Sequence, residues 1–82
     1  MNDLEVEIGR TLGASAFFVY QVVKENPNST ALDIQVETGL SETCVSTVLA
    51  KLRKAKVLEY KNIYKCKFSY KENKEKDKWE FH

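Results

Sequence analysis

Apolar residues recur at helical spacing most clearly between residues 42 and 55. Val45, Val48, Leu49 and Leu52 fall at i, i+3, i+4 and i+7, which is the spacing of one buried stripe on an α-helix. The other side of this helix carries small, hydroxylated or basic residues, namely Thr43, Ser46, Thr47, Ala50, Lys51 and Lys54. The pattern therefore predicts a helix with a solvent-facing side that suits a DNA groove.

A shorter helix is predicted just before it, across a tight corner. Ser29 or Thr30 can cap its start, since a hydroxyl accepts a hydrogen bond from an unpaired amide of the first turn. Gly39 ends it, because glycine adopts the positive φ that such a turn needs. Ser41 then caps the following helix, and Leu40 is placed to pack under the corner.

Two more helices are predicted before Pro27. The first starts at Asn2 or Asp3 and ends or bends near Gly13, with Leu4, Ile8 and Leu12 lining one side. The second runs from Ala14 or Ser15 to Glu25, and its expected stripe consists of Phe18, Val19, Val22 and Val23, widened by Phe17 and Tyr20. Asn26-Pro27-Asn28 then ends the helix, because proline disfavours helix in the residue before it.

A β-region is predicted after residue 57. Residues 64–70 alternate, with Tyr64, Cys66, Phe68 and Tyr70 on one face and Lys65, Lys67 and Ser69 on the other. We favour a hairpin of 64–70 with 78–82, whose charged tip is the apolar-free run 71–78. A second register pairs 57–61 with 64–70 across Asn62 and leaves a loose C-terminal tail. Trp79 and Phe81 favour the first register, because a disordered tail has little use for them.

The run IQVETGLSETCVSTVLAKL, residues 34–52, followed by RKAKVLE, resembles the helix-turn-helix of winged-helix transcription regulators of the broad MarR and ArsR type. The resemblance covers roughly residues 14–70. Gln35 replaces the usual alanine, Cys44 the usual threonine and Lys56 the usual glycine before the wing. Thr47 stands where many relatives carry an arginine or another long polar side chain, which weakens the base readout expected there.

The resemblance implies an α+β, mostly helical fold: a winged helix-turn-helix with an N-terminal helix, a three-helix core and a C-terminal β-hairpin wing. We expect one domain over residues 1–82, divided into a helical extension at 1–13, a core at 14–55 and a wing at 57–82. The resemblance also implies a short extended segment at Ser29 that pairs with the wing. The N-terminal helix either makes a dimer contact, as extra helices often do in such regulators, or covers its own core.

The net charge of +1 is divided unevenly along the chain. Residues 1–40 carry two basic and six acidic side chains, a net charge of −4, whereas residues 41–82 carry eleven basic and six acidic ones, a net charge of +5. The basic half contains the proposed recognition helix and wing, which fits a face turned to a polyanion. The alternative is that these lysines only solvate a small surface.

Composition excludes several classes of function. No segment approaches the roughly 20 apolar residues of a membrane span, and no secretory signal is visible, so we expect an intracellular, cytoplasmic protein without a membrane partner. Two cysteines and one terminal histidine give neither a disulfide framework nor a metal quartet, and no catalytic motif appears. We therefore expect no enzyme activity, no cofactor and no small-molecule ligand, although a ligand entering between the helices was a further alternative.

The expected partner is double-stranded DNA, bound by a homodimer, because a chain of 82 residues gains stability from dimerisation. Short side chains at the start of the recognition helix would reach base edges, and lysines there and in the wing would contact phosphates. The candidate DNA-binding residues are Ser41, Glu42, Thr43, Ser46, Thr47, Lys51, Arg53, Lys54, Lys65, Lys67, Lys71, Lys74 and Lys76, with Lys78 as a further wing lysine.

Three alternatives stay open from the sequence. Cys44 near the start of the recognition helix is either a redox-sensitive thiol or a small residue beside the turn. Cys66 is either a core or interface residue or half of a bridge between two copies. The whole domain is either a DNA-binding regulator or a winged-helix module for protein contact, and its size and lysine content also suit a viral or plasmid-borne regulator.

Overall fold

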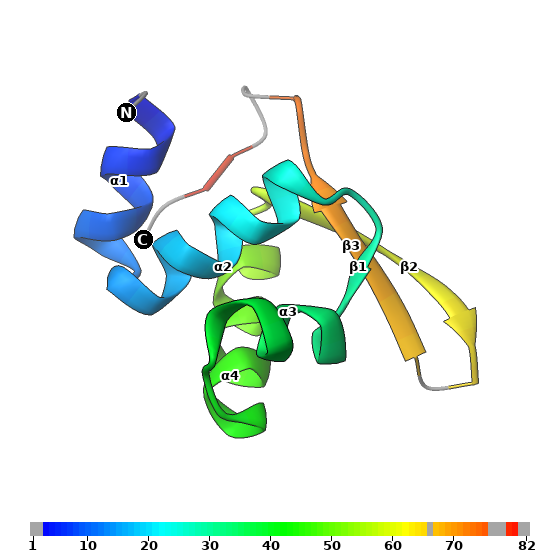
Figure 1. The fold of residues 1–82 in the computed structure, drawn as a ribbon. Coiled ribbons are helices and arrows are strands. Elements are labelled where there is room, and N and C mark those ends of the chain that lie inside the picture. Colours follow the sequence, from blue (N-terminus) through cyan, green and yellow to red (C-terminus); the bar gives the residue numbers. More distant parts are fainter. Residues whose placement is uncertain (1–2, 66, 76–78, 81–82) are drawn as a thin grey trace.

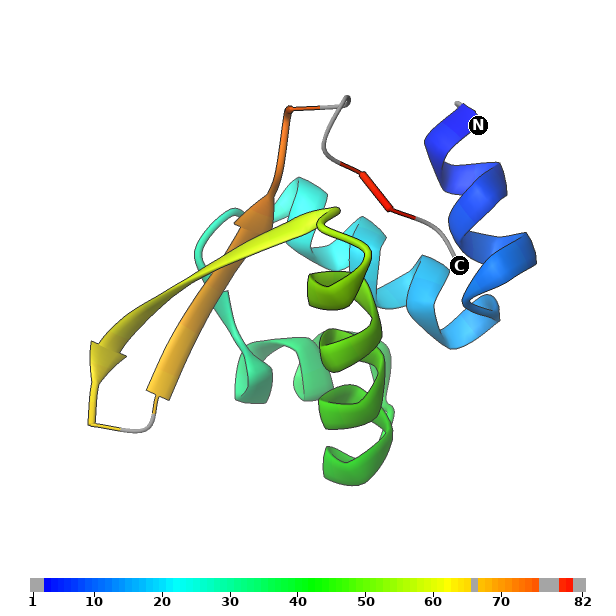
Figure 2. The same cartoon turned by 180° about the vertical axis from the view of Figure 1, so that it is seen from behind.

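Four helices gather on one side of the molecule, and a β-hairpin extends away from them (Figure 1). The computed structural model describes residues 3–65, 67–75 and 79–80. The elements are α1 (Asp3–Thr11), α2 (Ala14–Glu25), β1 (Ser29–Thr30), α3 (Ala31–Thr38), α4 (Glu42–Lys54), β2 (Leu58–Tyr64) and β3 (Lys67–Glu72). The reverse view shows the same projecting hairpin (Figure 2). The α+β, mostly helical fold with a β-wing is therefore confirmed.

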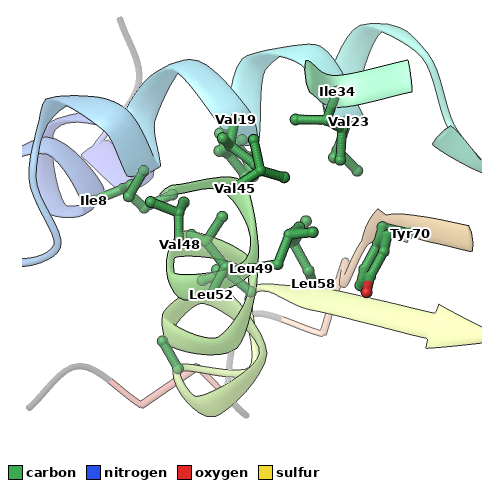
Figure 3. Packing of buried hydrophobic residues seen from close by; sticks show 14 residues of the cluster. Ile8, Val19, Val23, Ile34, Val45, Val48, Leu49, Leu52, Leu58 and Tyr70 are labelled. Atoms are coloured by element: carbon green, nitrogen blue, oxygen red, sulfur yellow. The ribbon is translucent and has the colours of Figure 1, made fainter. Parts of the chain in front are cut away.

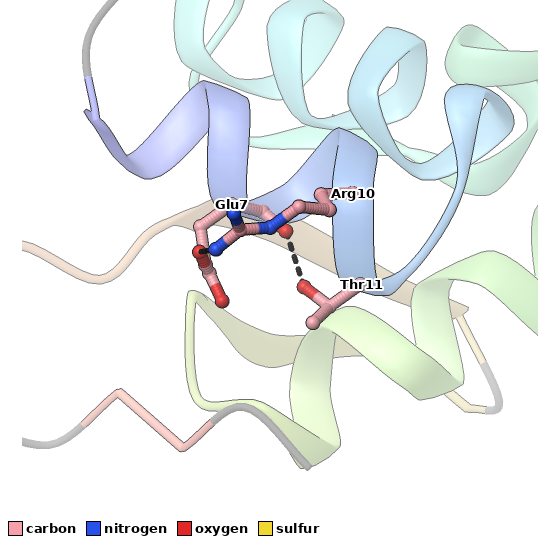
Figure 4. Close-up of polar contacts among 3 residues, drawn as sticks. All are labelled: Glu7, Arg10 and Thr11. Atoms are coloured by element: carbon pink, nitrogen blue, oxygen red, sulfur yellow. Dashed lines mark hydrogen bonds and ion pairs between the residues drawn. The ribbon is translucent and has the colours of Figure 1, made fainter.

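Helix α1 is stabilised on its exposed side by local polar contacts (Figure 4). The Arg10 guanidinium lies 2.7 Å from the Glu7 carboxylate, one turn earlier, and the Thr11 hydroxyl donates to the Glu7 carbonyl. An exposed pair at this spacing contributes only about 0.2–0.5 kcal/mol to a helix. The buried side chain of Ile8 therefore does more to hold α1 against α2.

The buried face of α2 is rotated relative to the predicted stripe. Val19 and Val23 are buried as expected, but Phe18 is 53% exposed, and Ala16 and Tyr20 take its place in the core. Both sets of residues follow a helical repeat, so the hydrophobic pattern alone did not fix which aromatic faces inward. Phe18 instead meets the edge of Phe17, with ring centroids 5.8 Å apart.

The helix-turn-helix has the caps that the sequence predicts. Thr30 accepts a hydrogen bond from the Asp33 amide at 3.2 Å, and Asp33 accepts one from the Thr30 amide at 3.1 Å, which is a complete capping box. Gly39 ends α3 with φ of 74°, and the Ser41 hydroxyl accepts from the Cys44 amide at 3.1 Å. Leu40 is half-buried under the corner. These contacts fix where α4 begins and how it leaves the turn.

The predicted wing register is wrong. Strand β3 (67–72) pairs antiparallel with β2 (58–64), from Leu58 opposite Glu72 to Tyr64 opposite Lys67. It does not pair with 78–82; residues 79–80 form no strand, and 78, 81 and 82 lie outside the described residues. The competing register named the right partner but placed the turn at Asn62, which belongs to β2.

The turn lies further along the chain, because Asn62 belongs to β2 and its side chain stabilises the turn that follows. Its side-chain amide donates to the Lys65 carbonyl at 2.7 Å, and Lys65 adopts φ of 48°. Ile63 is an extra residue between the pairs Asn62/Phe68 and Tyr64/Lys67, so β2 contains a β-bulge at this point. The predicted strand 64–70 is thus divided, because Tyr64 ends β2 and Lys67 begins β3.

Trp79 favoured the predicted hairpin of 64–70 with 78–82, but it has a different role in the structure. It is half-buried against the core, and its indole nitrogen donates to the Asn73 carbonyl at 3.0 Å. The Glu80 amide donates to the Ala55 carbonyl at 2.7 Å, and the Glu80 carboxylate pairs with Lys56 at 2.7 Å. The tail is thus folded back on the end of α4 at residues 79–80.

The core lies where the helices meet the base of the sheet (Figure 3). Val45, Val48, Leu49 and Leu52 of α4 are all buried, as predicted. Ile8, Val19, Val23, Ile34, Leu58 and Tyr70 complete the labelled part of this cluster. In the described residues no helix is long and apolar enough to cross a membrane.

Strand β1 joins the sheet at the edge opposite β2, in the order β1-β3-β2. Ser29 lies opposite Tyr70 and Thr30 opposite Ser69, so the expected pairing of this short piece with the wing is confirmed. The pairing ties the start of α3 directly to the wing strand β3.

Candidate nucleic-acid interface

Helix α4 presents one complete side to solvent. Thr43, Ser46, Thr47, Ala50, Lys51 and Lys54 are all exposed, as are Ser41 and Glu42 at its start. The opposite stripe is buried in the core, so the helix cannot rotate to hide the exposed side without losing that burial. The position and exposure of this set are therefore as the sequence predicted.

The solvent-facing residues of α4 form two rows, one ending beside α1 and the other at the wing. Thr43, Thr47, Lys51 and Lys54 follow one another at intervals of four, four and three residues. The second row begins with the exposed Ser46 and Ala50 and ends at the half-buried Arg53, which contacts the wing. Lys51 and Lys54, at the end of the first row, line a shallow hollow with Thr11 and Leu12 at the end of α1.

Arg53 joins the recognition helix to the wing. Its guanidinium carbon lies 4.7 Å from the centroid of the Tyr60 ring in β2, within cation–π range. The Tyr60 ring in turn meets the edge of Phe68 in β3, with centroids 5.6 Å apart and an interplanar angle of 72°. A stack of three side chains thus runs from α4 across both wing strands.

The Arg53 Nε atom is buried and has no hydrogen-bond acceptor among the described residues. A desolvated donor without an acceptor costs about 1–3 kcal/mol. The side chain lines an open pocket of about 590 Å³, together with Tyr60, Lys56, Lys61 and Lys71. The pocket also contains the Glu59 carboxylate, which lies 3.5 Å from the Lys71 ammonium and partly offsets the cationic groups.

The wing lysines lie in two separate places. Lys65 and Lys67 are exposed at the far end of the hairpin. Lys71 lies near its base, 3.5 Å from the Glu59 carboxylate, and Lys74 follows β3 beside Asp3 and Lys24. The run 71–78 is therefore not the tip of the wing; its predicted contact Lys76 lies outside the described residues, as does Lys78.

Sequence reasoning missed Tyr60, Lys61 and Phe68 as parts of this surface. A signal was present, since Leu58 and Tyr60 alternate with Glu59 and Lys61 as in a half-buried strand. It was overlooked because Asn62 was weighed as a turn residue, and asparagine is common in turns.

Cys44 is half-buried and packs against the core beside the turn. This placement agrees with its interpretation as a small residue that replaces threonine. The redox alternative stays a prediction. Cys66 lies outside the described residues, so neither interpretation of its thiol is tested.

No family model matches the chain, and a search of curated proteins found no match either. Solved structures do match. One is BpsR of Bordetella bronchiseptica, whose DNA binding is regulated by 6-hydroxynicotinic acid: it is 17% identical over 88% of this chain and 56% of BpsR, with a TM-score of 0.71. Another is MarR, 11% identical over 90% of this chain and 59% of MarR, with a TM-score of 0.73.

At these identities the likeness establishes the fold, which is the winged helix-turn-helix of MarR-like regulators. The resemblance read from residues 34–52 is therefore confirmed for the fold. The chain spans less than two thirds of the length of either matched structure.

Proposed function

We propose that this chain is a sequence-specific regulator of transcription that binds double-stranded DNA as a homodimer. The observation that carries the proposal is the exposed side of α4, where Thr43, Ser46 and Thr47 precede Lys51 and Lys54 on a helix anchored by its opposite face. The fold shared with MarR and BpsR supports the same function.

Base readout is assigned to the first turns of α4. Glu42 can accept from a cytosine amine, and Thr43 or Thr47 can contact a thymine methyl group in the major groove. These side chains are short, so each contact contributes modestly. Specificity then depends partly on DNA shape and on two copies that read two half-sites.

Phosphate contacts are assigned to the cationic residues around this helix. Lys51 and Lys54 lie on α4, and Lys65 and Lys67 lie at the wing tip. Arg53 lies between the two groups, on α4 and in contact with Tyr60 of β2. Each phosphate contact lowers the slope of log affinity against log salt by about 0.9. Several such contacts give a strong salt dependence.

An electrophoretic mobility assay with random duplex at low and high salt tests the DNA-binding function. We expect retardation at micromolar protein that weakens steeply as salt rises, and a selected duplex should bind more tightly than the random pool. Absence of any salt-sensitive retardation rules the proposal out. Sedimentation of the free protein and the complex tests the homodimer, and the spacing of half-sites in selected DNA reports the same property.

A protein-contact module is the alternative, and one observation favours it. Leu32 and Val36 lie one turn apart on α3 and are 67% and 75% exposed. Exposed apolar residues of this kind are typical of protein interfaces. They lie on α3, however, whereas the exposed side of α4 is hydroxylated and basic. The mobility assay separates the two functions.

The expectation of no small-molecule ligand stays a prediction. The DNA binding of BpsR is regulated by 6-hydroxynicotinic acid, so an organic anion is a relevant compound to test here. Titration of the protein–DNA complex with this compound, followed by fluorescence anisotropy, gives the answer for one ligand. Release of DNA would contradict our expectation.

A further inference from the structure

Exposed apolar side chains gather on the wing. In the described part of the chain the large exposed ones are Val6, Phe18, Leu32, Val36, Tyr60, Ile63 and Tyr64, and the last three all belong to β2. Tyr60 is accounted for by its contacts with Arg53 and Phe68. Ile63 and Tyr64 lie beyond these contacts, 51% and 62% exposed.

The backbone of the hairpin displays these two residues together. Tyr64 pairs with Lys67, and Ile63 is the extra residue that the β-bulge inserts directly before it in β2. The turn next to them is closed by the hydrogen bond from Asn62 to Lys65. Bulges often re-aim side chains beside functional sites. Here the bulge places an aliphatic and an aromatic residue at the far end of a projecting hairpin.

The exposure of Ile63 and Tyr64 is unfavourable in water unless a partner covers these side chains. Strand β2 is an edge of the sheet, and apolar side chains on an exposed edge favour aggregation. Three lysines, Lys61, Lys65 and Lys67, surround the pair and are all exposed. The Lys65 ammonium lies 5.4 Å from the centroid of the Tyr64 ring. The tip therefore combines an apolar centre with a cationic rim.

We propose that Ile63 and Tyr64 form a wedge that enters the minor groove of duplex DNA and partly unstacks one base step. The inference rests on the proposed DNA-binding function and names the element that deforms the DNA. Apolar side chains that enter the minor groove kink a duplex toward the major groove, while nearby cations hold the phosphates. The lysine rim supplies that charge complementarity, and the Arg53–Tyr60 contact holds the strand that carries Ile63 and Tyr64 against α4.

The wedge also predicts a sequence preference. Pyrimidine–purine steps such as TA are the easiest to unstack, and A·T-rich minor grooves attract cations most strongly. A TA step at the position of the wing is therefore expected to favour binding without any hydrogen bond to its bases.

The test uses the full chain with the variant Ile63→Thr/Tyr64→Thr, in which threonine keeps the strand propensity and removes the apolar bulk. Bending is measured by energy transfer between dyes at the two ends of the duplex, and unstacking by 2-aminopurine fluorescence at a TA step. We expect the double variant to lose the bend and the fluorescence increase, and to bind about tenfold more weakly. Its salt slope should stay unchanged, since no phosphate contact is removed.

Two control variants separate the wedge from charge and from general surface polarity. Lys65→Gln should reduce the salt slope by about 0.9 for each bound copy and keep the bend. Val36→Ser removes an apolar side chain that is 75% exposed on α3, and it should change neither the bend nor the salt slope.

The inference is overturned if the double variant bends and unstacks DNA as the unmodified protein does. It is also overturned if the double variant changes the sedimentation coefficient of the free protein and leaves bending intact, because the tip would then join two copies through β2. If the unmodified protein binds no duplex at all, the proposed function itself has failed, which the mobility assay shows independently.

Discussion

The Arg53 guanidinium carbon lies 4.7 Å from the centroid of the Tyr60 ring, so the recognition helix and the first wing strand are in direct contact. Chain connectivity keeps the two side chains near each other, since six residues lie between them and only a short turn joins α4 to β2. It makes the position of the wing depend on the end of the recognition helix. For α4 to bind in one groove of the DNA and the wing in another, the two elements must keep a fixed relative position.

Replacement of Tyr60 by alanine should loosen the wing and weaken DNA binding. The change removes the cation–π contact and the edge contact with Phe68, each worth about 0.5–1.5 kcal/mol. Tyr60→Phe keeps both ring contacts and should bind almost as the unmodified protein does. Fluorescence anisotropy with a labelled duplex measures the affinities. Equal affinities for the alanine and phenylalanine variants would show that the stack has no role in binding.

Replacement of Thr47 by glutamate should weaken specific binding without unfolding the protein. Thr47 is exposed in the middle of α4, so the new carboxylate meets no core residue, but it faces the DNA in the proposed complex. We expect at least a roughly tenfold loss of affinity from the repulsion of phosphates. Gln21→Glu adds the same charge on α2 and is the matched control. A similar loss in both variants would assign the effect to net charge.

The helix-turn-helix was predictable because its signals are local. The hydroxyl caps at Thr30 and Ser41, the glycine at position 39 and the α4 stripe each act within a few residues. The register of the wing was not predictable in this way. It depends on a bulge at Ile63 and on the tertiary contacts of Trp79, which have no short-range signature, and the local signal of Asn62 fits a turn at that residue as well as one after it.

The candidate site was likewise predictable where it depends on local signals and not where it depends on strand pairing. The exposed residues of α4 follow from the helical repeat, so their side of the helix was correctly identified. Lys71 and Lys74 were misplaced, because assignment to the wing tip depended on the wrong strand pairing. The Arg53–Tyr60 contact joins two elements whose relative position no sequence period reports.

Replacement of Lys56 by glycine should stabilise the protein. Lys56 adopts φ of 62°, a left-handed conformation that costs an L-residue roughly 1–2 kcal/mol. Glycine avoids this cost but loses about 0.5–1 kcal/mol through the entropy of the unfolded chain. The substitution also removes the exposed ion pair with Glu80. We expect a net gain of about 0.5 kcal/mol, seen as a higher urea midpoint.

Glu80→Gln is the control for that gain, because it removes the ion pair and leaves the backbone at Lys56 unchanged. It should shift the midpoint little, since exposed ion pairs contribute weakly. A urea midpoint for Lys56→Gly below that of Glu80→Gln would contradict the conclusion that the backbone is strained at position 56.

The contacts of Tyr20 and Lys24 predict a loss of stability in alkali. The Tyr20 hydroxyl donates to the Glu72 carboxylate at 2.9 Å, and burial, followed by that bond, raises the pKa of Tyr20 well above its ordinary value of 10.0. The bond to Glu5 at 3.0 Å raises the pKa of Lys24 above 10.5. Both groups thus hold their protons more tightly in the folded chain than in the unfolded chain.

The sign of the effect follows from proton linkage. Below about pH 10 both states carry both protons, so the stabilisation is fully present. Above that pH the unfolded chain releases protons first, and the free energy of unfolding falls as the pH rises. Urea unfolding between about pH 8 and pH 11 should show this fall, and Tyr20→Phe should make it shallower. An unchanged pH dependence in that variant would exclude Tyr20 as its source.

The corrected wing predicts which lysines contact phosphates. Lys65 and Lys67 lie at the far end of the hairpin, whereas Lys74 follows β3 beside Asp3 and Lys24, on the side of α1 and α2. A lysine that binds phosphate releases counterions, so its replacement by glutamine should reduce the salt slope by about 0.9 for each bound copy. We expect this reduction for Lys65→Gln and Lys67→Gln, and an unchanged slope for Lys74→Gln, although all three variants lose the same charge. If Lys74→Gln reduced the slope as much as the tip variants, DNA would have to approach the 71–78 side of the molecule, and the hairpin 58–72 could not be the wing that binds it.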